Sequence, residues 1–205
     1  QEMSRGLGDV YKRQSIDVIH ETDVLVVGSG PGGLSAAIAS ARCGVKTTLL
    51  ERFGCFGGNI TVVGVEGFAW YRHEKTVEAG GIGREFEELA KEMGAAVPES
   101  QSLSYELDSE GFKLVADKLV MDSGIHPMLH RSFSMPIMEG NTIIGVIVES
   151  KAGREAILSK VVIDATGDAD VAFRAGAQLN TMPVEELMAT SVMFHLAGVD
   201  KKAFL

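Results

Sequence analysis

A short apolar run that ends in a glycine-rich turn is the feature that most constrains the fold of this 205-residue chain. Residues 23–28 read DVLVVG, a continuous apolar segment typical of a parallel strand buried on both faces. The turn that follows fits the pattern G-x-G-x-x-G at Gly28, Gly30 and Gly33. Residues 34–44 then carry apolar side chains on one helical face and end at a glycine. A strand, a glycine turn and a helix in this order predict the start of a nucleotide-binding βαβ unit.

Each part of this turn has a physical role in binding a dinucleotide. The first glycine permits the tight turn, the second lets the backbone approach a pyrophosphate, and the third lets the helix pack closely on the strand. The N-terminus of the helix supplies free N–H groups and a positive dipole end. A second buried strand, residues 45–51, ends at Glu51, where a carboxylate accepts hydrogen bonds from ribose hydroxyls. These features predict a dinucleotide site that suits NAD and FAD equally.

The sequence after Glu51 favours FAD. An NAD dehydrogenase commonly continues with a helix and a third strand, whereas this chain continues with a second glycine-rich stretch, residues 54–59. Residues 129–164 then alternate strand-like runs with tight turns, which predicts a β-meander whose last strand leads into IDATGDAD, residues 163–170. Gly167 would let the end of this strand pass close to the nucleotide. Three aspartates of the segment are candidate acceptors for a ribityl or ribose hydroxyl: Asp164, Asp168 and Asp170.

Two amphipathic helices are predicted between the second glycine-rich stretch and the meander. They cover residues 83–94 and 108–124, and Ser109 is the expected cap of the second helix. The segment FAWYRHEK, which starts at Phe68, carries the most chemically active side chains outside the nucleotide motifs. Arg72 is a candidate for holding a carboxylate substrate and His73 for moving protons at neutral pH, although an exposed loop gives the same pattern. No catalytic residue is assigned, and no metal site is predicted.

Composition restricts the partners. The formal net charge of −9 argues against nucleic-acid binding, which favours a basic face. The apolar runs fall well short of the roughly 20 residues of a membrane-spanning helix. Cys43 and Cys55 are too few for a disulfide framework or an iron–sulfur site, so a cluster would need residues beyond this chain. We therefore expect a cytoplasmic protein that acts on a small-molecule substrate, with neither nucleic acid nor membrane as partner. The oligomeric state and the role of Cys55 stay open.

Two stretches of the chain resemble FAD-dependent oxidoreductases of the glutathione-reductase-type flavin fold. They are VLVVGSGPGGLSAAIASARCGVKTTLLERFGCFGGNIT and SKVVIDATGDADVAFRAGA. The nearest branch is allied to the flavin subunit of heterodisulfide reductase, with fumarate-reductase-like flavoproteins more distant. The resemblance begins at about Thr22. The C-x4-C dithiol of disulfide reductases is absent, because Ile60 stands five residues after Cys55.

The resemblance implies a set of FAD-binding positions. The pyrophosphate would lie at Gly28, Ser29, Gly30, Pro31, Gly32 and Gly33. The adenosine would contact Glu51, Arg52 and the strand 131–134, with Phe133 the preferred residue of that strand. The pyrophosphate and flavin would contact Gly57, Gly58, Asn59, Ala165, Thr166, Gly167 and one acid of the last bend, for which Asp168 is chosen. NAD(P)H is a possible electron partner.

The expected fold is α/β: a Rossmann-like FAD-binding domain with a parallel sheet and a β-meander, followed by part of a substrate domain. Residues 1–14 resemble translated adaptor sequence and are left out of the fold prediction. The expected divisions are 15–60 for the first FAD-binding segment, 61–107 for a substrate-side insertion, 108–178 for the return to the FAD-binding domain, and 179–205 for the start of the substrate domain. Family members return to the flavin domain once more, so we expect this chain to be C-terminally incomplete and inactive alone.

Three other functions remain compatible with the sequence. An NAD(P)-dependent dehydrogenase shares the fingerprint up to Glu51, and it predicts a response to NADH but none to FAD. A non-catalytic nucleotide-binding fragment would bind without turnover. A flavoprotein that modifies tRNA shares the same fingerprint, but the acidic balance of the chain argues against it.

Overall fold

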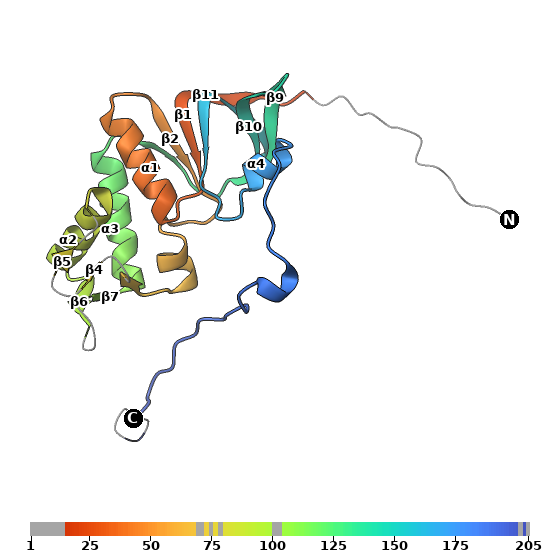
Figure 1. The fold of residues 1–205 in the computed structure, drawn as a ribbon. Coiled ribbons are helices and arrows are strands. Elements are labelled where there is room, and N and C mark those ends of the chain that lie inside the picture. The colour runs from red at the N-terminus through yellow and green to blue at the C-terminus, as the bar shows by residue number, and fades with distance from the viewer. Residues whose placement is uncertain are drawn as a thin grey trace.

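A six-stranded sheet forms the centre of the computed structural model, which describes residues 15–68, 72–73, 76–77, 80–99, 104–200 and 203. The sheet has the order β8-β2-β1-β11-β10-β9 (Figure 1). The first four strands are parallel: β8 (His126–Met128), β2 (Thr47–Leu50), β1 (Val18–Val27) and β11 (Gly153–Asp164). The other two are antiparallel to their neighbours: β10 (Thr142–Ser150) and β9 (Ser132–Glu139). The meander β9–β10–β11 thus ends by joining the parallel sheet next to β1.

Three helices lie on one side of this sheet: α1 (Pro31–Arg42), α2 (Ile82–Glu92) and α3 (Ser109–Asp122). Helix α1 lies against the strands, and α2 is packed on α1 and α3 (Figure 1). Their apolar sides meet the sheet in one core, in which Phe112 of α3 is 1% exposed and its ring stacks on Phe86 of α2 at 5.6 Å between centroids. Val26 and Leu49 extend this core from the strands. The helical spacing of apolar side chains therefore positions α1 over the ends of β1 and β2.

The opposite face of the sheet has its own core. Leu25, Val27 and Leu50 pack there with Val146 and Ile157 of the meander. The short helix α4 (Asp170–Arg174) closes this side through one buried valine. Alternating side chains of β1 thus face two cores, as the continuous apolar run predicted.

Short elements connect the glycine-rich stretch to α3. A π-helical turn, η1 (Asn59–Val63), precedes a small antiparallel sheet of β3 (Gly67–Phe68), β7 (Tyr105–Leu107) and β6 (Ala96–Pro98). Two further strands, β4 (Arg72–His73) and β5 (Thr76–Val77), pair antiparallel. The predicted substrate roles of Arg72 and His73 concern side chains outside the described part of the structure, and residues 69–71 and 74–75 lie outside it entirely.

The chain leaves the folded body after α4 (Figure 1). Every residue from 176 to 200 is exposed, and the only helical turn assigned within that range is η2 (Val184–Glu186). None of the helices in the described residues is long and apolar enough to cross a membrane.

The α/β fold class predicted from the sequence is confirmed, including the parallel sheet and the β-meander. Two local details differ. Strand β8 was not predicted, and the expected cap Ser109 is wrong because the side chain of Asp108 accepts the N–H of Glu110 and caps α3 instead. The predicted domain divisions stay predictions.

Candidate functional site

A cavity of about 680 Å³ opens where β1, β2 and β11 end. Ligands of open α/β sheets bind outside the carboxyl ends of the strands. The volume lies within the roughly 300–1,000 Å³ of small-molecule pockets. The cavity is lined by residues 27–32, 50–53, 58–59, 62–63, 131–133, 164–167, 169–170 and 172. Segments far apart in the sequence therefore meet around one space.

The glycine turn after β1 forms one wall, and its glycines have different reasons to lack a side chain. A Cβ on Gly28 would lie 2.4 Å from the carbonyl oxygen of Ala165, and one on Gly33 would lie 1.9 Å from the carbonyl oxygen of Gly28. A Cβ on Gly30 would meet no atom within 4 Å. The first and third glycines thus allow close packing, while the second keeps the cavity wall free of side chain, as the motif predicts.

The N-terminus of α1 faces the same cavity. Gly30 is the N-cap residue, and no side chain caps the helix there. Pro31 occupies the first turn, where its missing N–H costs no helical hydrogen bond. Backbone N–H groups of this turn remain available for an anion, and the helix dipole favours negative charge at this end.

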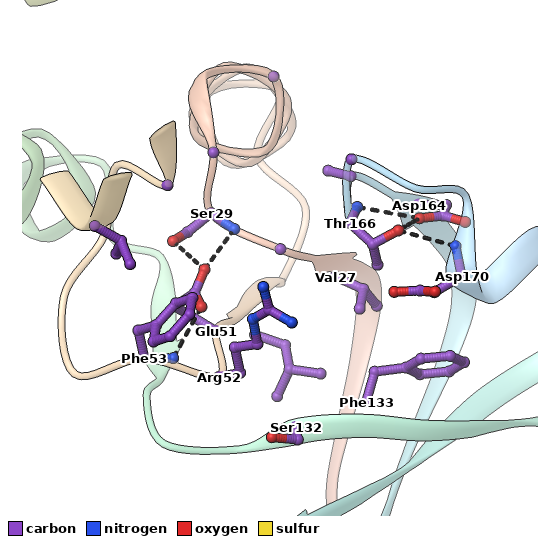
Figure 2. Close-up of a pocket in the computed structure, with 18 of the residues that line it drawn as sticks. Val27, Ser29, Glu51, Arg52, Phe53, Ser132, Phe133, Asp164, Thr166 and Asp170 are labelled. Carbon is purple, nitrogen blue, oxygen red and sulfur yellow. Dashed lines mark hydrogen bonds between the residues drawn. The ribbon is translucent and has the colours of Figure 1, made fainter. Parts of the chain in front are cut away.

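Glu51 is held at the end of β2 although it carries a carboxylate and is only 6% exposed. Its Oε2 accepts the Ser29 N–H at 3.0 Å and the Ser29 hydroxyl at 2.5 Å, and its Oε1 accepts the Phe53 N–H at 2.9 Å (Figure 2). A carboxylate has about four acceptor positions, so these three bonds leave capacity for a ligand hydroxyl. Burial without such donors would be costly, so the bonds explain how the carboxylate is tolerated there.

The second glycine-rich stretch packs directly on the first. The N–H of Gly57 donates to the Ser29 carbonyl at 2.9 Å, and a Cβ on Gly58 would lie 2.7 Å from the Cα of Gly30. Gly54 has another reason to be glycine, because a Cβ there would lie 2.6 Å from the ring of His130. The stretch therefore serves close packing as well as lining the cavity.

Two arginines and several carboxylates give the cavity mixed charge. The guanidinium of Arg52 lies 4.7 Å from the centre of the Phe53 ring. Arg131 pairs with Glu155 through Nε and Oε2 at 3.3 Å. In Figure 2, Phe133 and Asp170 lie on the side of the cavity opposite Glu51. The site thus combines cationic side chains, aromatic faces and hydroxyl acceptors.

Most of the predicted site residues line this cavity. They are Gly28, Ser29, Gly30, Pro31, Gly32, Glu51, Arg52, Gly58, Asn59, Phe133, Ala165, Thr166 and Gly167. Three predicted residues, Gly33, Gly57 and Asp168, are not among the lining residues. Asp164 and Asp170, the other two candidate acids, are. That each residue contacts a cofactor stays a prediction.

The sequence interpretation missed several apolar lining residues, among them Phe53, Val62 and Val63. The two valines belong to η1 and are 39% and 47% exposed. Nothing in a pair of valines after a glycine-rich stretch distinguishes a cavity wall from an ordinary strand, because a π-helical turn has no strong sequence pattern.

A family model described as FAD dependent oxidoreductase matches residues 23–205. The chain belongs to the FAD dependent oxidoreductase family. FAD is the cofactor that this membership assigns, and the resemblance noted in the sequence is confirmed. The structural features suit a dinucleotide: a side-chain-free glycine wall, an uncapped helix N-terminus and a buried acid beside them. Among the described residues, no three His, Cys, Asp or Glu side chains gather as they would at a metal site.

Known proteins resemble this chain over part of their length. Thiamine thiazole synthase of Metallosphaera sedula is 33% identical over 160 residues, which are 73% of this chain and 55% of that protein. L-Proline dehydrogenase from P. horikoshii has a TM-score of 0.58 at 14% identity, with 78% of this chain and 57% of that chain covered. A geranylgeranyl bacteriochlorophyll reductase-like protein from Thermoplasma acidophilum has a TM-score of 0.56 at 20% identity, with 78% and 43% covered. The solved structures show a shared fold, and the chain spans about half the length of the curated relatives it matches.

Proposed function

We propose that the cavity at the carboxyl ends of β1, β2 and β11 binds FAD and that the protein is an oxidoreductase. The observation that carries the proposal is the meeting of the glycine turn, Glu51 and the bend after β11 around one cavity. These are the three features that the family resemblance assigns to the pyrophosphate, the adenosine and the flavin.

The chain's own residues bind and orient the cofactor in this proposal. Gly30 and the first turn of α1 receive the pyrophosphate, where N–H groups and the helix dipole stabilise its charge. Glu51 accepts the ribose hydroxyls, and Arg52 with the backbone of residues 131–133 contacts the adenine. The backbone of residues 165–167 contacts the flavin portion, and Gly58 and Asn59 face the region between pyrophosphate and flavin.

The proposed reaction passes a hydride or an electron pair between a small-molecule substrate and an acceptor, for which NAD(P)H is a candidate partner. Bound FAD supplies the redox chemistry, and the protein supplies binding, orientation and electrostatics. Family membership favours FAD over the alternative of an NAD(P)-dependent dehydrogenase. A cytoplasmic location, a small-molecule substrate and the absence of a nucleic-acid partner remain parts of the proposal.

A second candidate function is thiazole synthesis for thiamine. It is favoured by the 33% identity to thiamine thiazole synthase over 73% of this chain. Growth of a thiazole-requiring bacterial strain on expression of the full-length gene would support this candidate. Oxidation of a substrate with reduction of the flavin, without such growth, would support the first.

The decisive experiment is to purify the full-length gene product and to measure the binding of FAD and of NADH to its cofactor-free form by titration. We expect FAD to bind with the visible absorbance of a bound oxidised flavin and NADH to bind more weakly at this cavity. A folded protein that stays colourless with excess FAD while binding NADH tightly would contradict the proposal and favour the dehydrogenase.

A further inference from the structure

One carboxylate joins both sides of the bend that follows β11. The Oδ1 atom of Asp164 accepts the Thr166 N–H at 3.1 Å and the Thr166 hydroxyl at 2.8 Å. Its Oδ2 atom accepts the Ala172 N–H, which belongs to α4, at 3.0 Å. The Thr166 oxygen in turn accepts the Asp170 N–H at 3.0 Å (Figure 2). Asp164 thus links the end of the strand, the bend and the helix.

Beyond β11, the shape of the bend is not defined by regular hydrogen bonds between strands. Ala165 donates its N–H to the Val27 carbonyl at 2.9 Å, and this is the last such bond to β1. Beyond it, Gly167 has φ +91° and Ala169 has φ +57°, a left-handed conformation that a residue with a side chain rarely adopts. Irregular backbone of this kind persists where the surroundings hold it, and a side-chain acceptor is the usual means.

The same bend forms part of the cavity wall. Residues 164–167 line the cavity, and the carbonyl of Ala165 lies so close to Gly28 that no side chain fits between them. A shift of the bend would therefore change both the wall and its contact with the glycine turn.

We propose that Asp164 is a positioning residue for the cofactor: it sets the conformation of residues 165–167, which contact the flavin portion of FAD. This inference rests on the proposed function. Asp164 acts through the backbone, because its oxygens hold the Thr166 N–H and hydroxyl of the bend and the Ala172 N–H of α4. Thr166 completes the same network through its hydroxyl.

Four variants of the full-length gene product test the inference. Asp164→Asn keeps the shape but exchanges one acceptor oxygen for an NH₂ group, which cannot accept the Ala172 N–H. Thr166→Val removes the hydroxyl at nearly constant volume, and Thr166→Ser restores it. Glu139→Gln is the matched control, since it removes an exposed carboxylate at the end of β9, away from the cavity.

The measurements are the FAD dissociation constant, the visible spectrum of the protein saturated with FAD, and the thermal unfolding of the cofactor-free protein. We expect Asp164→Asn and Thr166→Val to raise the dissociation constant about tenfold or more and to alter the bound-flavin spectrum. Thr166→Ser should recover most of the affinity lost in Thr166→Val, and Glu139→Gln should match the wild type. A merely structural role would lower the unfolding temperature without changing the spectrum at saturation.

Dissociation constants within about twofold of the wild type for Asp164→Asn and Thr166→Val, with unchanged spectra, would overturn the inference alone. If Asp164→Asn does not fold, the Thr166→Val and Thr166→Ser pair decides the question. A wild-type protein that binds no FAD would overturn the proposed function, and this inference with it.

Discussion

At the scale of single residues, the glycines of the turn after β1 serve two purposes: two of them allow close packing, and one faces the cavity. Gly28 and Gly33 are required by neighbouring backbone, so a side chain at either position disrupts the fold. A side chain at Gly30 would meet open space, because the volume beside this residue belongs to the cavity. Substitutions of Gly28 or Gly33 should therefore impair folding, whereas substitution of Gly30 should impair cofactor binding.

Replacement of Gly30 by valine is expected to abolish FAD binding while leaving the protein folded. A Cβ at this position meets no protein atom within 4 Å, and the branched side chain would occupy the path of the pyrophosphate. Calorimetric titration with FAD and circular dichroism would separate the two effects. Gly83→Val in α2, where a Cβ also meets no atom within 4 Å, is the matched control and should keep wild-type affinity. Wild-type affinity in Gly30→Val would refute the placement of the pyrophosphate.

Glu51 gives a second prediction at this scale. Glu51→Gln should weaken FAD binding by about 1–3 kcal/mol, because the charge-assisted bonds to ribose hydroxyls are lost. Ser29→Ala should weaken it less, since it removes the hydroxyl bond to the carboxylate but keeps the backbone N–H bond. Glu92→Gln, which removes an exposed carboxylate at the end of α2, should leave the affinity unchanged. Equal affinities for Glu51→Gln and the wild type would contradict the assigned role.

At the scale of elements, a histidine pair joins the two sides of β2. The rings of His20 in β1 and His126 in β8 stack at 4.4 Å, and His20 Nε2 lies 2.9 Å from the hydroxyl oxygen of Thr48. Burial lowers the pKa of His20 below 6.5, and the nearby His126 and Lys46 lower it further. The folded state therefore favours the neutral ring.

Because the pKa of His20 is lower in the folded state, the protein should lose stability in acid. As pH falls below 6.5, the unfolded chain takes up a proton at His20 before the folded chain does, so the free energy of unfolding decreases. The decrease stops once pH is below the folded-state pKa. His20→Gln should show a smaller loss of unfolding temperature than the wild type between pH values above and below 6.5. An unchanged pH profile in His20→Gln would exclude this source of acid sensitivity.

At the scale of the whole molecule, the segment 176–200 differs from the described residues of the sheet and the helices α1–α3. All of its residues are exposed, and large apolar side chains such as Val184 at 81% and Met188 at 95% face outward. Brief digestion of the 205-residue chain by a protease of broad specificity should therefore cut first within 176–200 and later within the sheet. Mass spectrometry of the fragments measures this order. If the first cuts fell within β9–β11, the sheet would be more accessible to the protease than the segment 176–200, and the prediction would be wrong.

The order of elements could be predicted from the sequence because each signal is local. The apolar run before Gly28, the helix after it and the strand ending at Glu51 all depend on neighbouring residues, and they were found at their expected places. The convergence of residues 28–33 with residues 165–168 followed from the family resemblance, and the contact between Gly28 and Ala165 confirms it.

What the sequence did not predict depends on tertiary contacts. Strand β8 consists of three residues with a central proline, a pattern that disfavours a strand until pairing with β2 decides it. The packing of Gly54 against His130 joins residues that no local pattern relates. The choice of Asp108 over Ser109 as helix cap moves the helix start by one residue, which is the usual uncertainty of such boundaries.

The position of β11 has a consequence for how the protein is made. It is the last of the six strands to leave the ribosome, yet it inserts between β1 and β10. A nascent chain that has emerged only as far as β10 already carries its glycine turn and Glu51, but it lacks the bend that completes the cavity. The cavity cannot be complete before β11 and its bend have been synthesised, and until then the edge of β1 that β11 covers has no partner strand.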